Sequence, residues 1–144
     1  MKRVAIAVVI LCAQGVMATQ KPVQTVDMPT KEMIAQNQKI AKLAAQEMNK
    51  TLPQTIDRYT TLKQINANGS ALEYLFEIDT GAKSDETVRK EDHARMQKAI
   101  TEGVCRSSKR FLEAKINISY IYRSAATKAE LFRFDITQSS CRDQ

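Results

Sequence analysis

Few side chains in this sequence are of the types that catalyse reactions, and they are not spaced as in known catalytic motifs. His93 is the only histidine, and it lies in the charged run of residues 89–93. A catalytic histidine needs a nucleophile or an orienting carboxylate beside it, and the adjacent Asp92 cannot share its face of a helix. No serine lies in a nucleophile elbow, and there is no glycine-rich phosphate loop. We therefore interpret His93 as a solvated surface residue and predict that the chain is not an enzyme.

Carboxylates and tyrosines are the other groups that could act on a ligand. Two carboxylates held roughly 5–9 Å apart could hydrolyse a glycan, but alternating acids are ordinary on the exposed face of a hairpin. The tyrosines could stack a ligand, although at core-facing positions we expect them to fill the core with the hydroxyl at its rim. These candidates are Asp57, Glu73, Glu77, Asp79, Tyr59, Tyr74, Tyr120 and Tyr122. No pattern among them predicts a cofactor.

The N-terminus has the features of a targeting segment. Lys2 and Arg3 precede an apolar run over residues 4–13, which is too short to span a bilayer as a helix. Residues 16–18, Val-Met-Ala, fit the small-x-small rule for signal-peptide cleavage. We predict a signal peptide over residues 1–18, cleaved near Ala18, and a periplasmic or secreted protein without a stable membrane span. A retained anchor is the alternative, and so is lipidation at Cys12, where Leu11 replaces the small residue that lipidation needs.

The cysteine count then predicts one covalent link. Removal of Cys12 leaves Cys105 and Cys141 in an oxidising compartment, where cysteine pairs normally oxidise. A disulfide between them would stabilise the fold by about 3–4 kcal/mol, because it restricts the unfolded chain. A free, reactive thiol pair is the alternative. Two cysteines and one histidine are too few for the usual four-ligand zinc site, so we predict no metal.

Charge and length limit the partners and the number of domains. The sequence has 22 basic and 16 acidic residues, with a formal net charge of +6. Basic residues alternate with acids, whereas nucleic-acid binding requires a clustered basic patch, so we expect no nucleic acid partner. Residues 19–29, with Pro22 and Pro29, are predicted to be a flexible leader, and a docking arm is the alternative. Residues 30–144 have the length of a single domain.

Two amphipathic helices and four strands are expected to build this domain. Thr30 is a good helix N-cap, and a helix should continue to about Thr51, ahead of Pro53. Its expected buried face consists of Met33, Ile34, Ile40, Leu43, Ala44 and Met48, at spacings near 3.6 residues. A second helix is expected to begin near Ser84 and to run to Leu112.

The strands are predicted from alternating apolar and polar residues. Residues 56–66 and 71–79 flank Asn68-Gly69, a pair typical of tight hairpin turns. Residues 115–141 contain a second hairpin, with its apolar residues at alternate positions in each strand. These elements predict an α+β fold of the order helix-hairpin-helix-hairpin. It would have a four-stranded antiparallel sheet, two helices on one face and one disulfide.

The sheet face without helices is the surface where we first expect contacts with other molecules. Leu75, Ile121 and Leu131 alternate with charged residues there and could form a shallow binding surface. The alternative is that they are scattered surface hydrophobes, which are common.

Several short motifs resemble small exported bacterial proteins, including the family called quorum-sensing-regulated virulence factor. They are Leu52-Pro53, Ile56-Asp57, Thr60-Thr61-Leu62, Leu72-x-Tyr74, Cys105, Ile118-x-Tyr120-x-Tyr122 and Cys141. That family usually has a glycine before the third strand, where this chain has Ala114-Lys115. The resemblance implies an exported α+β protein with one disulfide and without established catalytic residues.

These observations predict an exported, non-enzymatic bacterial protein that acts through contacts with a protein partner. It could be a secretion or conjugation accessory, or a virulence-associated factor. The alternative is a periplasmic inhibitor or immunity protein that binds a hydrolase or a toxin. A carrier that holds a small ligand in a cleft between helices and sheet is the third hypothesis.

Overall fold

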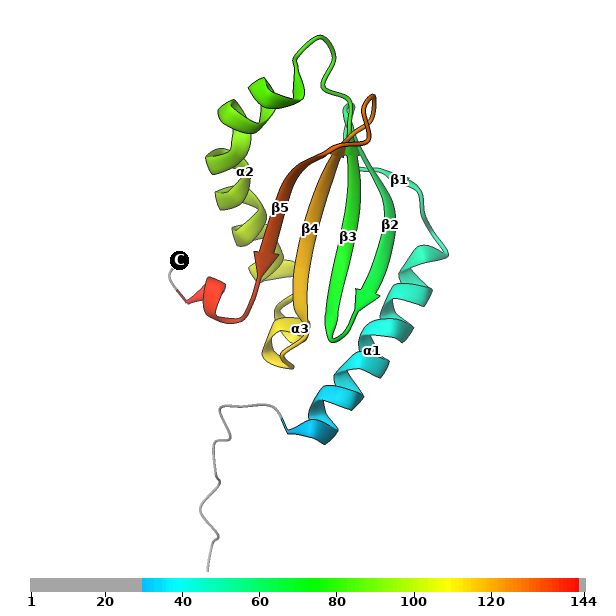
Figure 1. The fold of residues 1–144 in the computed structure, drawn as a ribbon. Helices are drawn as coiled ribbons and strands as arrows, with labels where there is room; N and C mark the ends of the chain where they lie inside the picture. Colours follow the sequence, from blue (N-terminus) through cyan, green and yellow to red (C-terminus); the bar gives the residue numbers. More distant parts are fainter. Residues whose placement is uncertain (1–29, 143–144) are drawn as a thin grey trace, which may run out of the picture.

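The computed structural model describes residues 30–142 (Figure 1). The predicted signal peptide and leader, residues 1–18 and 19–29, lie outside the described residues. No helix within residues 30–142 combines the length and the apolarity needed to cross a membrane. The elements in chain order are α1 (Lys31–Asn49), β1 (Gln54–Thr55), β2 (Thr60–Asn68), β3 (Ala71–Ile78), α2 (Asp85–Ser107), α3 (Lys109–Glu113), β4 (Asn117–Ser124), β5 (Glu130–Ile136) and the 3-10 turn η1 (Ser139–Cys141).

The sheet has five strands in the order β1-β2-β3-β4-β5 and is mixed rather than antiparallel. The predicted four-stranded antiparallel sheet is therefore wrong, because β3 and β4 pair in parallel along their whole length. Helices α2 and α3 form the long crossover that a parallel pair requires, and they return the chain to the end of the sheet where β3 began. The neighbouring pairs β2–β3 and β4–β5 are antiparallel hairpins.

The β2–β3 hairpin matches its prediction in one strand only. The strand predicted over residues 71–79 is confirmed as β3, and Gly69 adopts the positive φ (57°) that its turn requires. The strand predicted from Ile56 is wrong at its start. Asp57 Oδ1 accepts hydrogen bonds from the backbone N–H groups of Tyr59 and Thr60, both at 2.8 Å, so residues 56–59 form a turn and β2 begins at Thr60.

Helix α1 begins as predicted, but only part of its predicted face packs against the core, namely Ala44 and Met48. Thr30 is the N-cap, and its Oγ1 accepts a hydrogen bond from Met33 N (3.2 Å). The residues that are buried are Asn37, Ala41 and Ala45. The expected core residues Met33, Ile34, Ile40 and Leu43 are 39–55% exposed. Small alanines let the helix approach the sheet closely, and Asn37 Nδ2 donates to the backbone oxygen of Ala114 (2.7 Å).

The second predicted helix is divided into α2 and α3 at Ser108, where the backbone leaves helical geometry. Cys105 near the end of α2 forms a disulfide with Cys141 in η1, with their Cα atoms 5.6 Å apart. The bond therefore joins the crossover helix to the segment that follows β5.

Both long helices contribute to one hydrophobic core on a single face of the sheet. α1 supplies Ala41 and Ala45, and α2 supplies Val88 and Val104. The sheet supplies Leu62, Ile65, Leu72, Phe76, Ile118, Tyr122, Phe132, Phe134 and Ile136.

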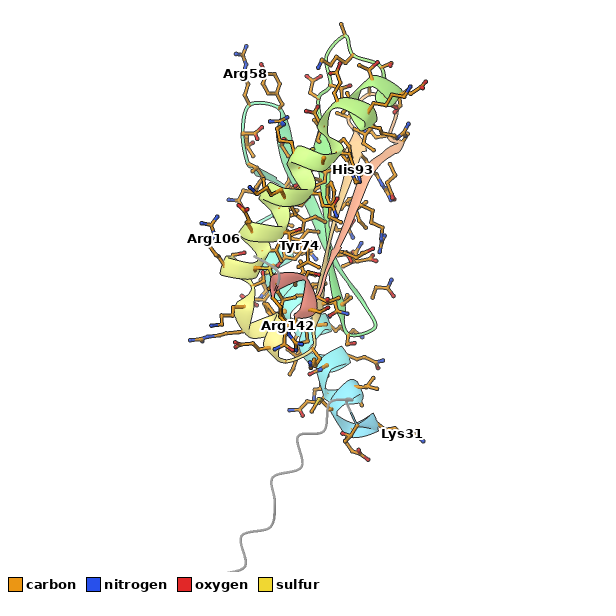
Figure 2. All side chains as sticks on the ribbon, turned by 90° about the vertical axis from the view of Figure 1, so that its left-hand side faces the viewer. Lys31, Arg58, Tyr74, His93, Arg106 and Arg142 are labelled. Carbon is orange, nitrogen blue, oxygen red and sulfur yellow. A yellow bond between two sulfur atoms is a disulfide. The ribbon has the colours of Figure 1, made fainter. Side chains whose placement is uncertain are left out.

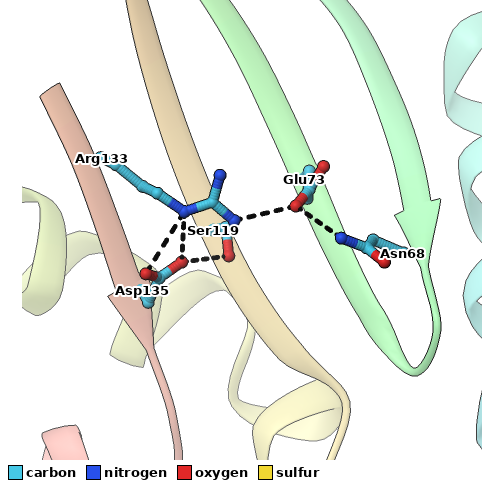
Figure 3. A network of polar contacts seen from close by, with 5 residues as sticks. All are labelled: Asn68, Glu73, Ser119, Arg133 and Asp135. Atoms are coloured by element: carbon cyan, nitrogen blue, oxygen red, sulfur yellow. Dashed lines mark hydrogen bonds and ion pairs between the residues drawn. The ribbon is translucent and has the colours of Figure 1, made fainter. Parts of the chain in front are cut away.

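The opposite sheet face is crossed by a polar network (Figure 3). Arg133 of β5 contacts Glu73 of β3 (Nη2 to Oε1, 2.9 Å) and Asp135 (Nε to Oδ1, 3.2 Å). Ser119 of β4 donates to Asp135 (2.6 Å), and Asn68 donates to Glu73 (3.1 Å). The network joins side chains from four strands across this face.

Candidate docking surface between the two long helices

The contact surface predicted on the open sheet face is not exposed. Ile121 and Leu131 are only 6% and 5% exposed, and Leu75 is half-buried. Ile121 lies in register between Leu75 and Arg133, beneath the side chains that form the Arg133–Glu73 ion pair. Leu131 lies at a β-bulge beside Phe132 and packs into the core. These three residues do not form the predicted binding surface.

The residues considered for catalysis are separated by their local structural roles. His93 is exposed on α2, and its ring centroid lies 5.4 Å from that of Phe134. Glu73 pairs with Arg133, and Glu77 pairs with Lys128 (3.0 Å). Asp57 and Asp79 accept backbone hydrogen bonds in turns. Within residues 30–142, no three His, Cys, Asp or Glu side chains are grouped so that they could hold a metal ion.

A largely apolar surface lies on the other side of the sheet, between α1 and α2. α1 packs on β2 at one side of the sheet and α2 packs on β5 at the other (Figure 1). The side chains between them are only partly covered. We call this region the inter-helix surface and define it by Met33, Ile40 and Met48 of α1, Tyr74 of β3, Tyr120 of β4, and Met96 and Ile100 of α2.

Hollows of different size lie at the two ends of this surface. One has a volume of about 580 Å³ and lies where β2 and β3 approach the first half of α2. Tyr59, Ile78 and Met96 are among its apolar residues, and Lys83 and Arg95 are among its charged ones. The other measures about 330 Å³ and lies between Met33 and Ile40 of α1 and residues 113–115. The larger hollow has room for several side chains of a bound molecule.

The floor of the inter-helix surface consists of closely packed aromatic rings. The ring centroids of Tyr74 and Tyr120 are 5.0 Å apart, and Phe76 lies 4.9 Å from Tyr120 and 4.7 Å from Tyr122. Burial raises the pKa of Tyr74 to about 12, and it also raises the pKa values of Tyr120 and Tyr122. The hydroxyls therefore stay protonated at neutral pH, and Tyr74 donates to Met48 Sδ (3.5 Å). Such a floor suits apolar binding rather than proton transfer.

An exposed turn borders the larger hollow. Ile56 and Tyr59 are 50% and 57% exposed, and the Arg58 guanidinium lies 5.5 Å from the Tyr59 ring centroid. Tyr59 thus departs from the core position predicted for the tyrosines. Tyrosine and arginine are frequent anchors in protein interfaces, and the hydrogen bonds of Asp57 hold this turn in one conformation.

The apolar period of the sequence includes residues of the inter-helix surface, but it predicts them as core residues. The 3.6-residue period correctly grouped Met33, Ile40 and Met48 on one side of α1. Periodicity identifies an apolar face but not the molecule that covers it. The alanines at positions 41 and 45, which allow close approach to the sheet, were the available signal that the side of α1 that carries them faces the sheet.

Comparisons with known proteins identify the fold. The structure resembles that of a Pseudomonas aeruginosa protein described as secreted, with 16% identity and a TM-score of 0.69 over 78% of this chain and 99% of that one. It also resembles the type 2 secretion system pilotin of Vibrio vulnificus, with 14% identity and a TM-score of 0.67 over 80% and 100% of the two chains. The type 2 secretion system pilotin of Vibrio cholerae is 20% identical, with a TM-score of 0.58 over 76% and 96%.

At these identities the likeness shows a shared fold. A comparison with curated proteins found no significant sequence match. A family model described as a domain of unknown function, DUF8479, matches residues 35–132, from the first turns of α1 into β5. That match covers more than half of the sequence, and the chain therefore belongs to the DUF8479 family.

Proposed function

We propose that this chain is an exported accessory of a bacterial secretion apparatus that binds an apolar helix of a protein partner. The predicted signal peptide accounts for export, and the inter-helix surface is the binding site. The observation that carries the proposal is the exposure of large apolar side chains on α1. Met33 and Ile40 are each about 40% exposed although a core lies beside them.

The composition of the inter-helix surface supports a protein partner. Single exposed hydrophobes are ordinary, but a contiguous apolar patch on a monomer marks an interaction site. Three of its seven members are methionines, Met33, Met48 and Met96. Methionine is flexible and polarisable, and it is common on surfaces that adapt to a partner.

The layout of the sheet supports a helical partner. β2 and β5 are separated by three strand spacings, or about 14 Å, whereas packed helices lie about 8–10 Å apart. Helices placed over these two strands cannot contact each other closely, and the space between them is too narrow to admit a third helix fully. A partner helix lying across both could insert apolar side chains at positions i, i+3, i+4 and i+7.

The structural relatives support a role in secretion. Two proteins with this fold are pilotins of type 2 secretion systems, and a third is described as secreted. The partner would accordingly be a subunit of an envelope secretion apparatus. In this role the protein would contribute binding and no catalytic group.

The test uses two isoleucines of α1 that are equally exposed. Ile40 and Ile34 are both 39% exposed, but only Ile40 belongs to the inter-helix surface. A photo-crosslinking amino acid at position 40 should form an adduct with a secretion subunit in intact cells, and the same probe at position 34 should not. Affinity for the purified partner should fall at least tenfold with Ile40→Asp and stay within twofold with Ile34→Asp.

Three results would contradict the proposal. Equal crosslinking from both positions would show that the contact is not specific to the inter-helix surface. Unchanged affinity of Ile40→Asp would remove this surface as the binding site. An adduct with a hydrolase or toxin would replace the secretion role with the inhibitor or immunity role.

A further inference from the structure

A separate polar hollow lies at the end of the molecule where α1 begins. In Figure 2, Lys31 and Arg142 lie toward this lower end, and Arg58 and His93 lie toward the other. The hollow has a volume of about 450 Å³, and its walls include Lys115, Arg142, Ser70, Asn117, Ser139 and Ile34. Among the residues that the structure describes, its lining contains two cations and several hydroxyl and amide donors but no carboxylate. That composition is complementary to an anion.

Lys115 occupies an unusual backbone position beside this hollow. Its φ is 65°, in the left-handed region that glycine adopts freely and that other residues adopt at a cost. It directly follows the end of α3, where glycine is the common residue. Its Nζ donates to Gln138 Oε1 (2.6 Å). An ammonium group has three N–H donors, so two remain for a ligand.

Among the described residues, the positive charges at this end form no ion pairs with acids. Neither Lys115 nor Arg142 forms an ion pair with a carboxylate within residues 30–142. The nearby Glu113 pairs with Lys109 (3.7 Å). An anion between Lys115 and Arg142 would therefore meet two cations that have no carboxylate partner within residues 30–142.

Apolar side chains adjoin the same cations. Ile34, which is 39% exposed, forms part of the polar hollow. Lys115 also lines the smaller hollow of the inter-helix surface, together with Met33 and Ile40. A ligand bound at Lys115 thus meets donors on one side and exposed apolar carbon on the other. This combination fits an anionic head joined to an apolar chain.

We propose that this hollow binds the phosphate group of an anionic lipid. Lys115 and Arg142 would contact the phosphate, Ser70, Asn117 and Ser139 would hydrogen-bond the headgroup, and Ile34 would contact the acyl chain. The described chain begins at Thr30 on this same end of the molecule (Figure 1). The turn at residues 56–59 lies toward the opposite end (Figure 2), so a lipid surface that contacts this hollow would leave the turn uncovered.

The test measures binding of short-chain lipids to the exported protein. Dihexanoyl phosphatidylglycerol, dihexanoyl phosphatidylcholine and inorganic phosphate are titrated separately below the micelle concentration, and backbone NMR shifts are recorded. Phosphatidylglycerol should bind at least tenfold more tightly than the other two, with the largest shifts at residues 34, 115 and 142. Lys115→Gly should weaken this binding at least tenfold, because it removes the ammonium group. The variant should still fold, because glycine adopts a φ of 65° without steric cost.

The chain supplies a matched control. Within the described part of the chain, Lys128 is the other lysine with a positive φ (62°), and it lies in the connection between β4 and β5. Lys128→Gly should leave the affinity for phosphatidylglycerol within twofold of the original, and Arg142→Gln should weaken it. Equal binding of inorganic phosphate would overturn the lipid assignment in favour of a free anion. Equal binding of phosphatidylcholine, or an unchanged affinity in Lys115→Gly, would overturn the site.

Discussion

At the scale of single residues, Glu73 shows how the open sheet face is held together. A hydrogen bond from Asn68, followed by contacts with Arg133, holds the pKa of Glu73 below its ordinary value of 4.5. The ionised carboxylate is therefore favoured in the folded protein. A lowered folded pKa gives stability that is complete above the unfolded pKa and is lost as the pH falls through the folded one.

The free energy of unfolding should accordingly decrease as the pH falls, and Glu73 should account for part of this decrease. The loss should begin near pH 4.5 and continue below it, because protonation removes the charge that Arg133 contacts. Glu73→Gln should be less stable at pH 7 and should lose less stability between pH 5 and 3. Urea unfolding followed by circular dichroism across this range measures both quantities.

The control is Glu47→Gln, at a carboxylate whose side chain is 73% exposed and pairs only with the neighbouring Lys50. Exposed pairs contribute little, so this variant should follow the original pH profile. A Glu73→Gln profile parallel to that of the original protein would show that the network does not link stability to pH.

Sequence reasoning at this scale succeeded where one residue type has one main structural use. Thr30 caps α1, and the cysteine count pointed to the pair that forms the disulfide. It failed at Ile121 and Leu131, which are covered by long side chains from other strands and by a bulge. Whether such residues are covered depends on which residues of the neighbouring strands lie opposite them. The sequence of a single strand does not reveal this register.

At the scale of elements, Asn49 joins the end of α1 to the edge of β2. Its Nδ2 donates to the backbone oxygen of Ile65 (2.6 Å), and its Oδ1 accepts from the backbone N–H of Ile65 (2.9 Å). β1 pairs with β2 only at Leu62 and Thr61. The Asn49 amide therefore takes the place of a neighbouring strand at Ile65 and satisfies two groups that would otherwise lie unpaired at the edge.

Replacing Asn49 by alanine should reduce the free energy of unfolding by about 1–3 kcal/mol, because two partly buried backbone groups lose their partners. Chemical denaturation at pH 7 measures the change. Asn66→Ala, at an exposed position of the same strand β2, is the matched control and should stay within about 0.5 kcal/mol of the original. Equal stability of both variants would mean that water replaces the Asn49 amide without cost.

The sequence predicted the elements more reliably than their arrangement. Strict alternation over Ala71–Ile78 identified β3, but the same alternation occurs in parallel and antiparallel strands. The parallel pairing of β3 with β4 depends on the path of α2 and α3 across one face. β1 has only two residues and lacks a period that could reveal it.

At the scale of the whole molecule, polarity divides the domain into surfaces with different properties. Ion pairs cover one face of the sheet, and a methionine- and tyrosine-rich surface remains between the helices on the other. Lys115 and Arg142, which form no ion pair within residues 30–142, lie at one end. The net charge of +6 predicted none of this, because composition does not record where charges lie. The resulting layout assigns protein binding and lipid binding to surfaces that share a border at Lys115.

The two proposed sites should be separable, and this expectation rests on both proposals. Met96 lines the larger hollow, whereas Arg142 lines the polar hollow and neither hollow of the inter-helix surface. Met96→Asp should reduce affinity for the partner helix at least tenfold and leave phosphatidylglycerol binding unchanged. Arg142→Gln should weaken phosphatidylglycerol binding and leave affinity for the partner helix unchanged. Both affinities should be measured by calorimetry in the original protein, the two single variants and the double variant. Because distant substitutions without shared contacts add within about 0.5 kcal/mol, a larger coupling would contradict the separation and show that lipid and partner compete for the shared border.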